Sequence, residues 1–120
     1  MKDTDSITNM FLDKHAACSC FVAFEAIVKS QLKINVTVSL GFAENFISSN
    51  SYRPSDIIKS RKGLTIKIAD TDAEGRLVLA DAMNWTQENY KIDKMIEIST
   101  LTYSCMKGLG RFHAGVYSNN

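Results

Sequence analysis

The sequence lacks long apolar runs and any excess of charge of one sign. No run approaches the ~18 consecutive apolar residues of a membrane-spanning helix, and the polar residues 1–6 have no signal-peptide core. The 14 basic and 13 acidic residues are interspersed and give a net charge of +1. A small, mixed charge provides no field to attract nucleic acid or an anionic membrane. We therefore expect a cytoplasmic protein with neither partner.

Cysteine, proline and the common nucleotide-binding glycine motifs are scarce or missing. The sequence has three cysteines, Cys18, Cys20 and Cys105. They form no C-x-x-C pair, so neither a disulfide framework nor a zinc site is indicated. The single proline, Pro54, lies in the one sizeable loop, residues 43–56. Neither G-x-x-x-x-G-K-[ST] nor G-x-G-x-x-G occurs, which argues against nucleotide binding.

The hydrophobic pattern predicts one domain of mixed helix and strand. Alternating apolar residues predict strands over 34–42, 56–60, 64–68, 94–100 and 114–118. Helices are predicted over 16–29, 75–90 and 101–108. The first helix is apolar on every side and should be buried. Gly63 should take a positive φ in a hairpin turn, and Gly108 or Gly110 should end the last helix. A helix followed by a strand favours a parallel sheet.

The most distinctive stretch is acidic and follows a predicted strand. If residues 70–76 are extended, one face carries Asp70, Asp72, Glu74 and Arg76. Neighbouring carboxylates need a bound cation or a shared proton, and oxygen ligands at this spacing suit a divalent metal. Arg76 would then face an anion held by the metal. The alternative is a solvated acidic turn in which Asp72 or Thr71 caps a helix.

Two further segments carry candidate site residues. Asp13 precedes the first helix and is either a metal ligand or a helix cap. Residues 99–102 follow a predicted strand and offer hydroxyls and turn amides, which suit substrate contacts or a strand-to-helix cap. Magnesium-dependent phosphoryl transfer is disfavoured, because no loop that could hold phosphates accompanies the acids.

Residues 71–82, TDAEGRLVLADA, resemble the N-T-D-A-E-G-R-L signature of the M17 leucyl aminopeptidases. Residues 43–45 and 51–57 resemble that family's A-E-N and Y-R-P-G-D-V loop, and residues 114–119 resemble its A-G-V-F-S-N strand. Residues 100–102 are similar to its A-T-L-T-G turn, and residues 10–17 to its M-x-x-D-M-G-G-A-A segment. The resemblance covers essentially the whole chain but only the middle of the family's catalytic domain.

The resemblance implies a fold and an activity. The fold is α/β with three layers, a mixed, mostly parallel sheet flanked by helices, and residues 1–120 form an incomplete catalytic domain. The activity is hydrolysis of N-terminal residues from peptides or dipeptides by an enzyme with two divalent metal ions, Mn or Zn. Two-metal aminopeptidases are a general class of such enzymes. The family further implies a homo-oligomer, a hexamer.

The resemblance also assigns residues. The metal ligands it implies are Asp13, Asp72 and Glu74, with Glu74 bridging the two ions. Arg76 would hold a bicarbonate that acts as general base, and Lys2 lies at the spacing of a lysine that polarises the scissile carbonyl. The substrate-binding residues it implies are Met10, Ala73, Thr100, Leu101 and Thr102. Met10 and Ala73 would line the side-chain pocket, and the other three would contribute their backbone.

The chain departs from the family at several points. A G-K-G…F-D-x-G-G strand, which supplies a ligating lysine and an aspartate bridging both metals, would lie just before Met1. Lys14 and His15 follow Asp13 in place of Met and Gly. Asp70 replaces the first Asn of the signature, and Tyr103 replaces a glycine. We therefore expect the isolated chain to be inactive. The alternative function is a truncated or decayed relative that acts as a metal-binding or assembly subunit.

Overall fold

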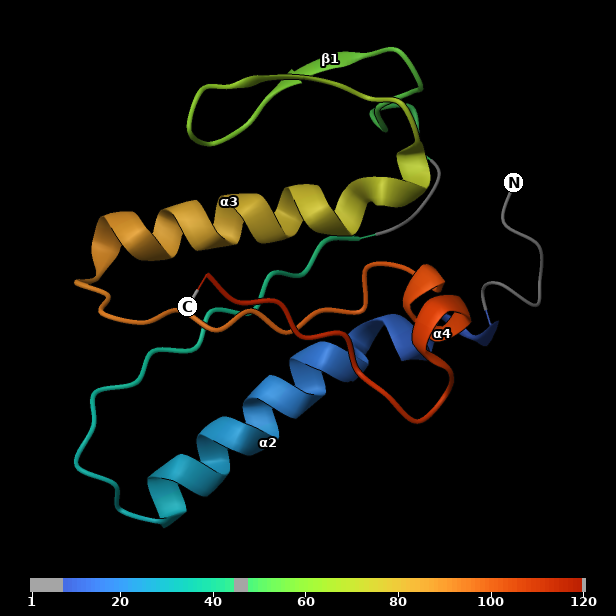
Figure 1. Ribbon diagram of the computed structural model, residues 1–120. Helices are drawn as coiled ribbons and strands as arrows, with labels where there is room; N and C mark the ends of the chain where they lie inside the picture. The colour runs from blue at the N-terminus through green and yellow to red at the C-terminus, as the bar shows by residue number, and fades with distance from the viewer. Residues whose placement is uncertain (1–7, 45–47, 120) are drawn as a thin grey trace.

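The computed structural model describes residues 8–44 and 48–119. Within them the 3-10 helix η1 (Met10–Lys14) leads into α2 (His15–Lys29), and a hairpin of β1 (Ile57–Lys59) and β2 (Thr65–Lys67) follows. The chain then forms the 3-10 helix η2 (Thr71–Ala73), α3 (Glu74–Asn89) and α4 (Ser104–Leu109). In Figure 1 the hairpin lies above α3 and α2 lies below it. No helix of these described residues is both long and apolar enough to span a membrane.

Helix α2 confirms the helix predicted over 16–29 but not its burial. Only Ala16 in α2 is buried, with 7% of its surface exposed. Phe21, Val22 and Val28 are 58–60% exposed. Among the described helices and strands, α2 packs closely only against the adjoining η1. The prediction of a buried helix is wrong for these residues because an all-round apolar helix is buried only where other elements surround it.

The predicted hairpin is confirmed, with strands shorter than the apolar pattern. β1 and β2 are antiparallel, and Ile58 pairs with Ile66. The Ser60 amide donates to the Leu64 carbonyl at 2.9 Å, and the Gly63 amide donates to the Ser60 carbonyl at 2.8 Å. Gly63 has a φ of +86°, which is the conformation that three-residue hairpin loops give to glycine.

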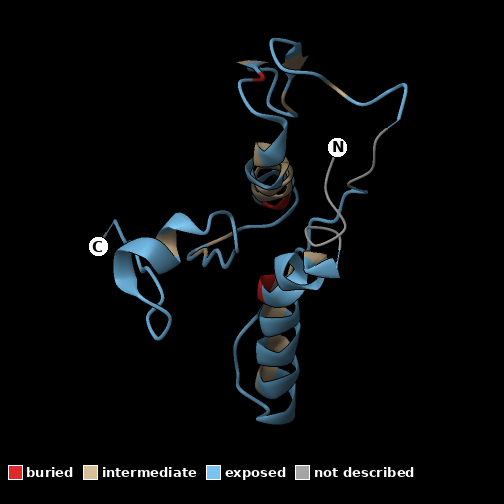
Figure 2. Cartoon of the chain, turned by 90° about the vertical axis from the view of Figure 1, so that its right-hand side faces the viewer, coloured by how far each residue is buried: buried red, intermediate tan, exposed pale blue. Residues whose placement is uncertain are grey.

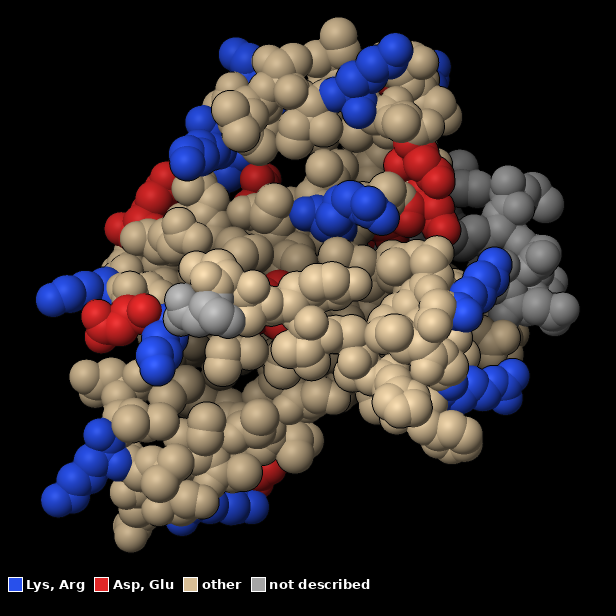
Figure 3. Space-filling model, in the orientation of Figure 1, with Lys and Arg blue, Asp and Glu red and all other residues tan. Residues whose placement is uncertain are grey.

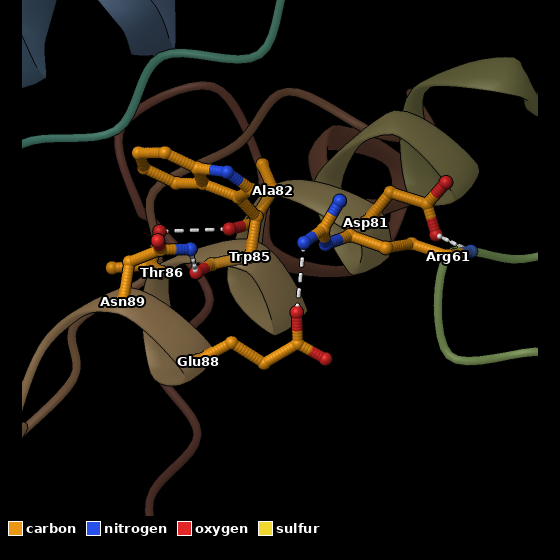
Figure 4. A network of polar contacts seen from close by, with 7 residues as sticks. All are labelled: Arg61, Asp81, Ala82, Trp85, Thr86, Glu88 and Asn89. Atoms are coloured by element: carbon orange, nitrogen blue, oxygen red, sulfur yellow. Dashed lines mark hydrogen bonds and ion pairs between the residues drawn. The ribbon is translucent and has the colours of Figure 1, made fainter.

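The range of α3 matches the predicted helix 75–90 within one residue at each end. Polar contacts join the hairpin turn to this helix. The backbone N–H of Arg61 donates to Asp81 Oδ1 at 2.9 Å, and its guanidinium donates to Glu88 Oε2 at 2.8 Å (Figure 4). On the same helix, the buried Thr86 donates its hydroxyl to the Ala82 carbonyl at 2.7 Å. The turn is therefore held against α3 by contacts made 20 and 27 residues apart.

The last helix, α4, confirms part of the prediction over 101–108. It begins at Ser104, so residues 101–103 precede it. Gly110 ends it with a φ of +82°, and its N–H donates to the Met106 carbonyl. Of the two glycines proposed to end this helix, Gly110 is therefore the one that does so, because glycine takes the positive φ of a helix end without strain.

The predictions of strands over 34–42, 94–100 and 114–118 are wrong for this structure. These segments pass between α3 and α2 in the view of Figure 1, and none forms a strand in the described residues. The sheet present there is the antiparallel pair β1–β2, and no parallel sheet is formed. Alternation of apolar residues favours an extended chain, but a strand also requires a neighbour to bond its backbone groups. The described elements are compatible with part of an α/β domain.

The molecule is open and buries little apolar surface. Its accessible surface is 10602 Å², whereas a compact monomer of this mass exposes about 6,500 Å². Its radius of gyration is 16.4 Å, against about 14 Å for a compact domain of this length. Figure 2 shows only a few buried positions along the described chain. These are the apolar Ala16 and Ile68 and the polar Thr86.

Candidate functional site

The acidic stretch is folded into helical turns. Asp70 is extended, with φ −140° and ψ 125°, and its Oδ1 accepts the Asp72 N–H at 2.9 Å. The chain then turns through η2 and enters α3 at Glu74. The prediction that residues 70–76 present one extended row of charges is therefore wrong. The physical reason is that the Asp70 carboxylate caps the 3-10 turn η2, which leads directly into α3.

The alternative prediction of a capped acidic turn is correct in kind, but the capping residue is Asp70 and neither Thr71 nor Asp72. Asparagine and aspartate are equally good caps because each offers a side-chain oxygen to the backbone. The replacement of the signature Asn by Asp70 therefore keeps the hydrogen bond that shapes this turn. It also adds a negative charge next to the start of α3.

Asp72, Glu74 and Arg76 lie around the beginning of α3. Asp72 and Arg76 are exposed, whereas Glu74 is half-buried. The N-terminal end of a helix carries partial positive charge, which favours carboxylates there. Figure 3 shows acidic side chains gathered at the end of the molecule where α3 begins. Ala73, predicted to line a substrate pocket, is half-buried directly before this helix.

Tyr52 lies close enough to this acidic end to feel its charge. Burial, and next the negative charge of Glu74, raise the pKa of the Tyr52 phenol above its ordinary value. Tyr52 precedes a tight turn in which the Asp56 N–H donates to the Arg53 carbonyl at 3.1 Å. In the sequence Tyr52 belongs only to the loop motif, and no local residue pattern indicates its electrostatic interaction with Glu74.

Asp13 and Thr100 are brought together although 87 residues separate them in the sequence. The Thr100 hydroxyl donates to the Asp13 backbone carbonyl at 3.1 Å. Asp13 lies in η1 with an exposed side chain. The adjacent Lys14 donates its ammonium group to the Met10 carbonyl at 3.0 Å. Met10, the other predicted pocket residue, is half-buried in the same 3-10 helix.

Leu101 and Gly75 connect this pair to the acidic end of α3. A Cβ added to Gly75 would lie 3.2 Å from Leu101 Cδ2, so the absence of a side chain permits close packing. Thr102 accepts the Ser104 N–H on its hydroxyl at 3.2 Å, which matches the proposed role of this segment in starting a helix. Segments around residues 13, 75 and 101 therefore meet at one place.

The predicted ligands do not by themselves form a metal centre. Within residues 8–44 and 48–119, no three His, Cys, Asp or Glu side chains are placed to hold a metal ion. Asp13, Asp72 and Glu74 therefore do not fit a dinuclear metal group unless other residues complete it. Lys2, predicted to act on the scissile carbonyl, lies outside the described residues.

A hollow in the described structure lies at the far end of α3 from these residues. It has a volume of about 360 Å³ and is open to solvent. Its walls come from the end of α3 and the following segment, with Gln87, Tyr90, Ile92, Asp93 and Met95. The acidic residues lie at the opposite end of α3, so this hollow is not the predicted substrate pocket.

Sequence comparison decides the family. The profile of the cytosol aminopeptidase family, catalytic domain, matches residues 1–120. The chain belongs to this family. It is 44% identical over 120 residues to a probable cytosol aminopeptidase of Clostridium tetani, covering all of this chain and 25% of that protein. Proteins with the same description from Sulfurihydrogenibium and Campylobacter jejuni are 45% and 39% identical, again over all of this chain.

These relatives are much longer than the chain. The 120 residues span about a quarter of the length of the cytosol aminopeptidases they match. No solved structure matches the chain at a significant level. The family match thus covers every residue of this chain and about a quarter of each relative.

Proposed function

We propose that this chain forms part of a metal-dependent aminopeptidase that removes N-terminal residues from peptides. The observation that carries the proposal is the meeting of η1, residues 100–102 and the start of α3. The Thr100 to Asp13 hydrogen bond and the packing of Leu101 on Gly75 join these three segments. Each segment holds residues that the aminopeptidase resemblance assigned to metal or substrate, so their convergence supports a shared site.

In this proposal Asp13, Asp72 and Glu74 are ligands of two divalent ions, Mn or Zn. Further ligands must come from outside the described residues, because the three acids do not complete a centre there. The positive end of α3 favours the negative charge of Asp72 and Glu74 in the absence of metal. Arg76, in the first turn of α3, would attract an anion, and bicarbonate is the anion we propose.

The substrates we propose are peptides or dipeptides with a free N-terminus. The backbone of Thr100, Leu101 and Thr102 would bind the substrate main chain beside Asp13. Met10 and Ala73 would contact the side chain of its first residue, and Lys2 would interact with the scissile carbonyl. The complete domain in this proposal has three αβα layers around a mixed, mostly parallel sheet and assembles as a hexamer in the cytoplasm.

A graft provides the test. In this graft, the 120 residues replace the matched quarter of the Clostridium tetani relative. We expect it to hydrolyse leucyl-p-nitroanilide in the presence of Mn or Zn, and we expect the isolated chain not to do so. Asp72→Asn and Glu74→Gln should each abolish turnover by the graft. Thr65→Ser, on the exposed hairpin, is the matched control and should leave turnover unchanged.

A second candidate is a non-catalytic relative that binds metal or serves in assembly. The observation that favours it is the pair Lys14 and His15 directly after Asp13, which places a cation next to a proposed metal ligand. A folded graft without turnover would contradict catalysis and favour this candidate. Restoration of turnover by Lys14→Met together with His15→Gly would locate the loss at this pair.

A further inference from the structure

Met10 is the residue of η1 that packs inward. It is half-buried, whereas the other four residues of this short helix are exposed. The exposed ones include the apolar Phe11 and Leu12. The backbone of η1 thus directs the Met10 side chain toward the rest of the chain. A contact that fixes this backbone therefore also fixes the position of the Met10 side chain.

Lys14 makes such a contact at the Met10 carbonyl. Its ammonium group donates to the carbonyl oxygen at 3.0 Å, four residues back along the chain. Lys14 is the last residue of η1, and a basic side chain in the last turn of a helix often donates to helix carbonyls. The aminopeptidase motif has methionine in place of Lys14, and methionine has no group to donate. The contact is therefore a feature of this sequence and not of the motif.

Asp13, next to Lys14, is held by a different contact. Among the described residues Lys14 forms no ion pair with Asp13, because its ammonium group is turned to the Met10 carbonyl. The Asp13 carbonyl instead accepts the Thr100 hydroxyl at 3.1 Å. Two side-chain donors therefore restrain η1, one at its first residue and one at its fourth. Because 3-10 helices have poor hydrogen-bond geometry of their own, such restraints contribute a large share of their stability.

We propose that Lys14 is a positioning residue that sets the selectivity of this chain for the first side chain of its substrate. The inference rests on the proposed function, in which Met10 contacts that side chain. A pocket wall that is already fixed does not have to be ordered on binding, so binding to it costs less free energy. The effect is largest for a substrate whose side chain reaches the wall. The contact should therefore favour leucine over alanine at the first position.

Substrate preference in the graft tests the role of Lys14. Lys14→Met should lower the ratio of kcat/KM for leucyl-p-nitroanilide to that for alanyl-p-nitroanilide by about two- to tenfold, the range expected when one hydrogen bond is lost. The change should lie in the KM of the leucyl substrate, since Lys14 touches no reacting atom. Lys14→Arg keeps a donor and should keep the parent ratio. Lys62→Met makes the same chemical change in the exposed hairpin turn and is the matched control.

A measurement on the isolated chain tests the contact without turnover. The NMR chemical shift of a carbonyl carbon depends on the hydrogen bonds that its oxygen accepts. The shift of the Met10 carbonyl carbon should therefore change in Lys14→Met. It should stay at the parent value in Lys62→Met and close to it in Lys14→Arg.

Three results would overturn the inference. They are an unchanged Met10 carbonyl shift in Lys14→Met, an unchanged substrate preference in an active Lys14→Met graft, and an equal change of preference in Lys62→Met. The failure of the proposed function is distinguishable from these. A graft in which neither the parent nor any variant turns over refutes the proposed function and, with it, the role in selectivity, while the Met10 carbonyl shift still decides whether Lys14 holds Met10.

Discussion

Residues 55–90 differ sharply from the other described residues in their packing and in the pairing of their backbone. In the first region the hairpin has its ladder, its turn is bonded to α3, and Ile68 is only 3% exposed. In the second region α2 packs closely only against η1, and the segments around it form no strand. Both regions contain runs of alternating apolar residues, so alternation alone does not explain the difference.

The two regions differ in how far along the sequence each strand lies from a strand that can pair with it. The strands of the hairpin pair across a short turn, so closing the loop costs little conformational entropy. The segments 34–42, 94–100 and 114–118 have apolar faces but no neighbouring strand in the described residues. A strand at any of these segments would need a neighbouring strand to bond its backbone groups. Four substitutions test this comparison, from the largest expected effect to the smallest.

Within residues 55–90, a substitution of Ile68 should cost the most stability. Its amide donates to the Asp56 carbonyl at 2.8 Å, and its side chain is the most buried apolar one described. Ile68→Ala should lower the free energy of opening of the hairpin by about 2–4 kcal/mol, through lost burial and a residual cavity. Ile57→Ala is the matched control: Ile57 is 70% exposed, and we expect less than about 0.5 kcal/mol. Equal losses of stability in Ile68→Ala and Ile57→Ala, measured by native-state amide exchange, would contradict this prediction.

Gly41 is one place where the chain outside residues 55–90 touches α3. An added Cβ there would lie 2.8 Å from Val78 Cγ1, which is closer than side chains tolerate. Gly41→Ala should therefore separate this segment from α3 at a cost of about 1–3 kcal/mol. The control is Gly108→Ala in α4, where a Cβ meets nothing within 4 Å and helix propensity improves. Amide hydrogen exchange in α3 is the measurement, and it should become faster in Gly41→Ala but not in Gly108→Ala. Unchanged protection in Gly41→Ala would show that the contact is dispensable.

Two substitutions of Asp70 distinguish the effect of its hydrogen bond from the effect of its charge at the start of α3. Asp70→Ala removes the acceptor for the Asp72 N–H and should destabilise η2 and the first turn of α3 by about 1 kcal/mol. Asp70→Asn keeps an acceptor and should have little effect. The readout is amide exchange at residues 72–76. If the Asn variant is as unstable as the Ala variant, the carboxylate charge matters and the cap does not.

Ser55 stores strain in the turn that leads into β1. It has a φ of +76° directly after Pro54, and the Asp56 N–H donates to the Arg53 carbonyl. A turn with proline second and a positive φ third favours glycine in the third place, and the aminopeptidase loop motif has glycine there. Ser55→Gly should therefore stabilise the hairpin by about 0.5–1 kcal/mol. Ser51→Gly is the control for added flexibility and should not stabilise it. A loss of stability in Ser55→Gly would contradict the prediction that Ser55 is strained at its positive φ.

The residues of the candidate site remain a prediction from motifs, and the structure tests only how they lie relative to one another. The acids, Thr100 and Leu101 were identified from motifs, and the structure joins Thr100 to Asp13 and packs Leu101 on Gly75. The prediction of an extended row of charges over residues 70–76 is wrong because the Asp72 N–H donates to Asp70 and the chain turns there. Alternation of residue types does not reveal such a hydrogen bond. The proximity of Tyr52 to Glu74 also depends on a loop and a helix meeting, so no local pattern indicated it.

The sequence by itself determined the features with local causes: the helix 74–89, the hairpin with Gly63 at positive φ, the end of α4 at one of two nearby glycines and the family of the chain. Backbone propensities and short-range hydrogen bonds act within a few residues, so a linear pattern contains them. Tertiary structure alone decided which apolar faces are covered and where the acids lie relative to Asp13. Burial and long-range contacts such as the 3.1 Å Thr100–Asp13 bond depend on which segments meet in space.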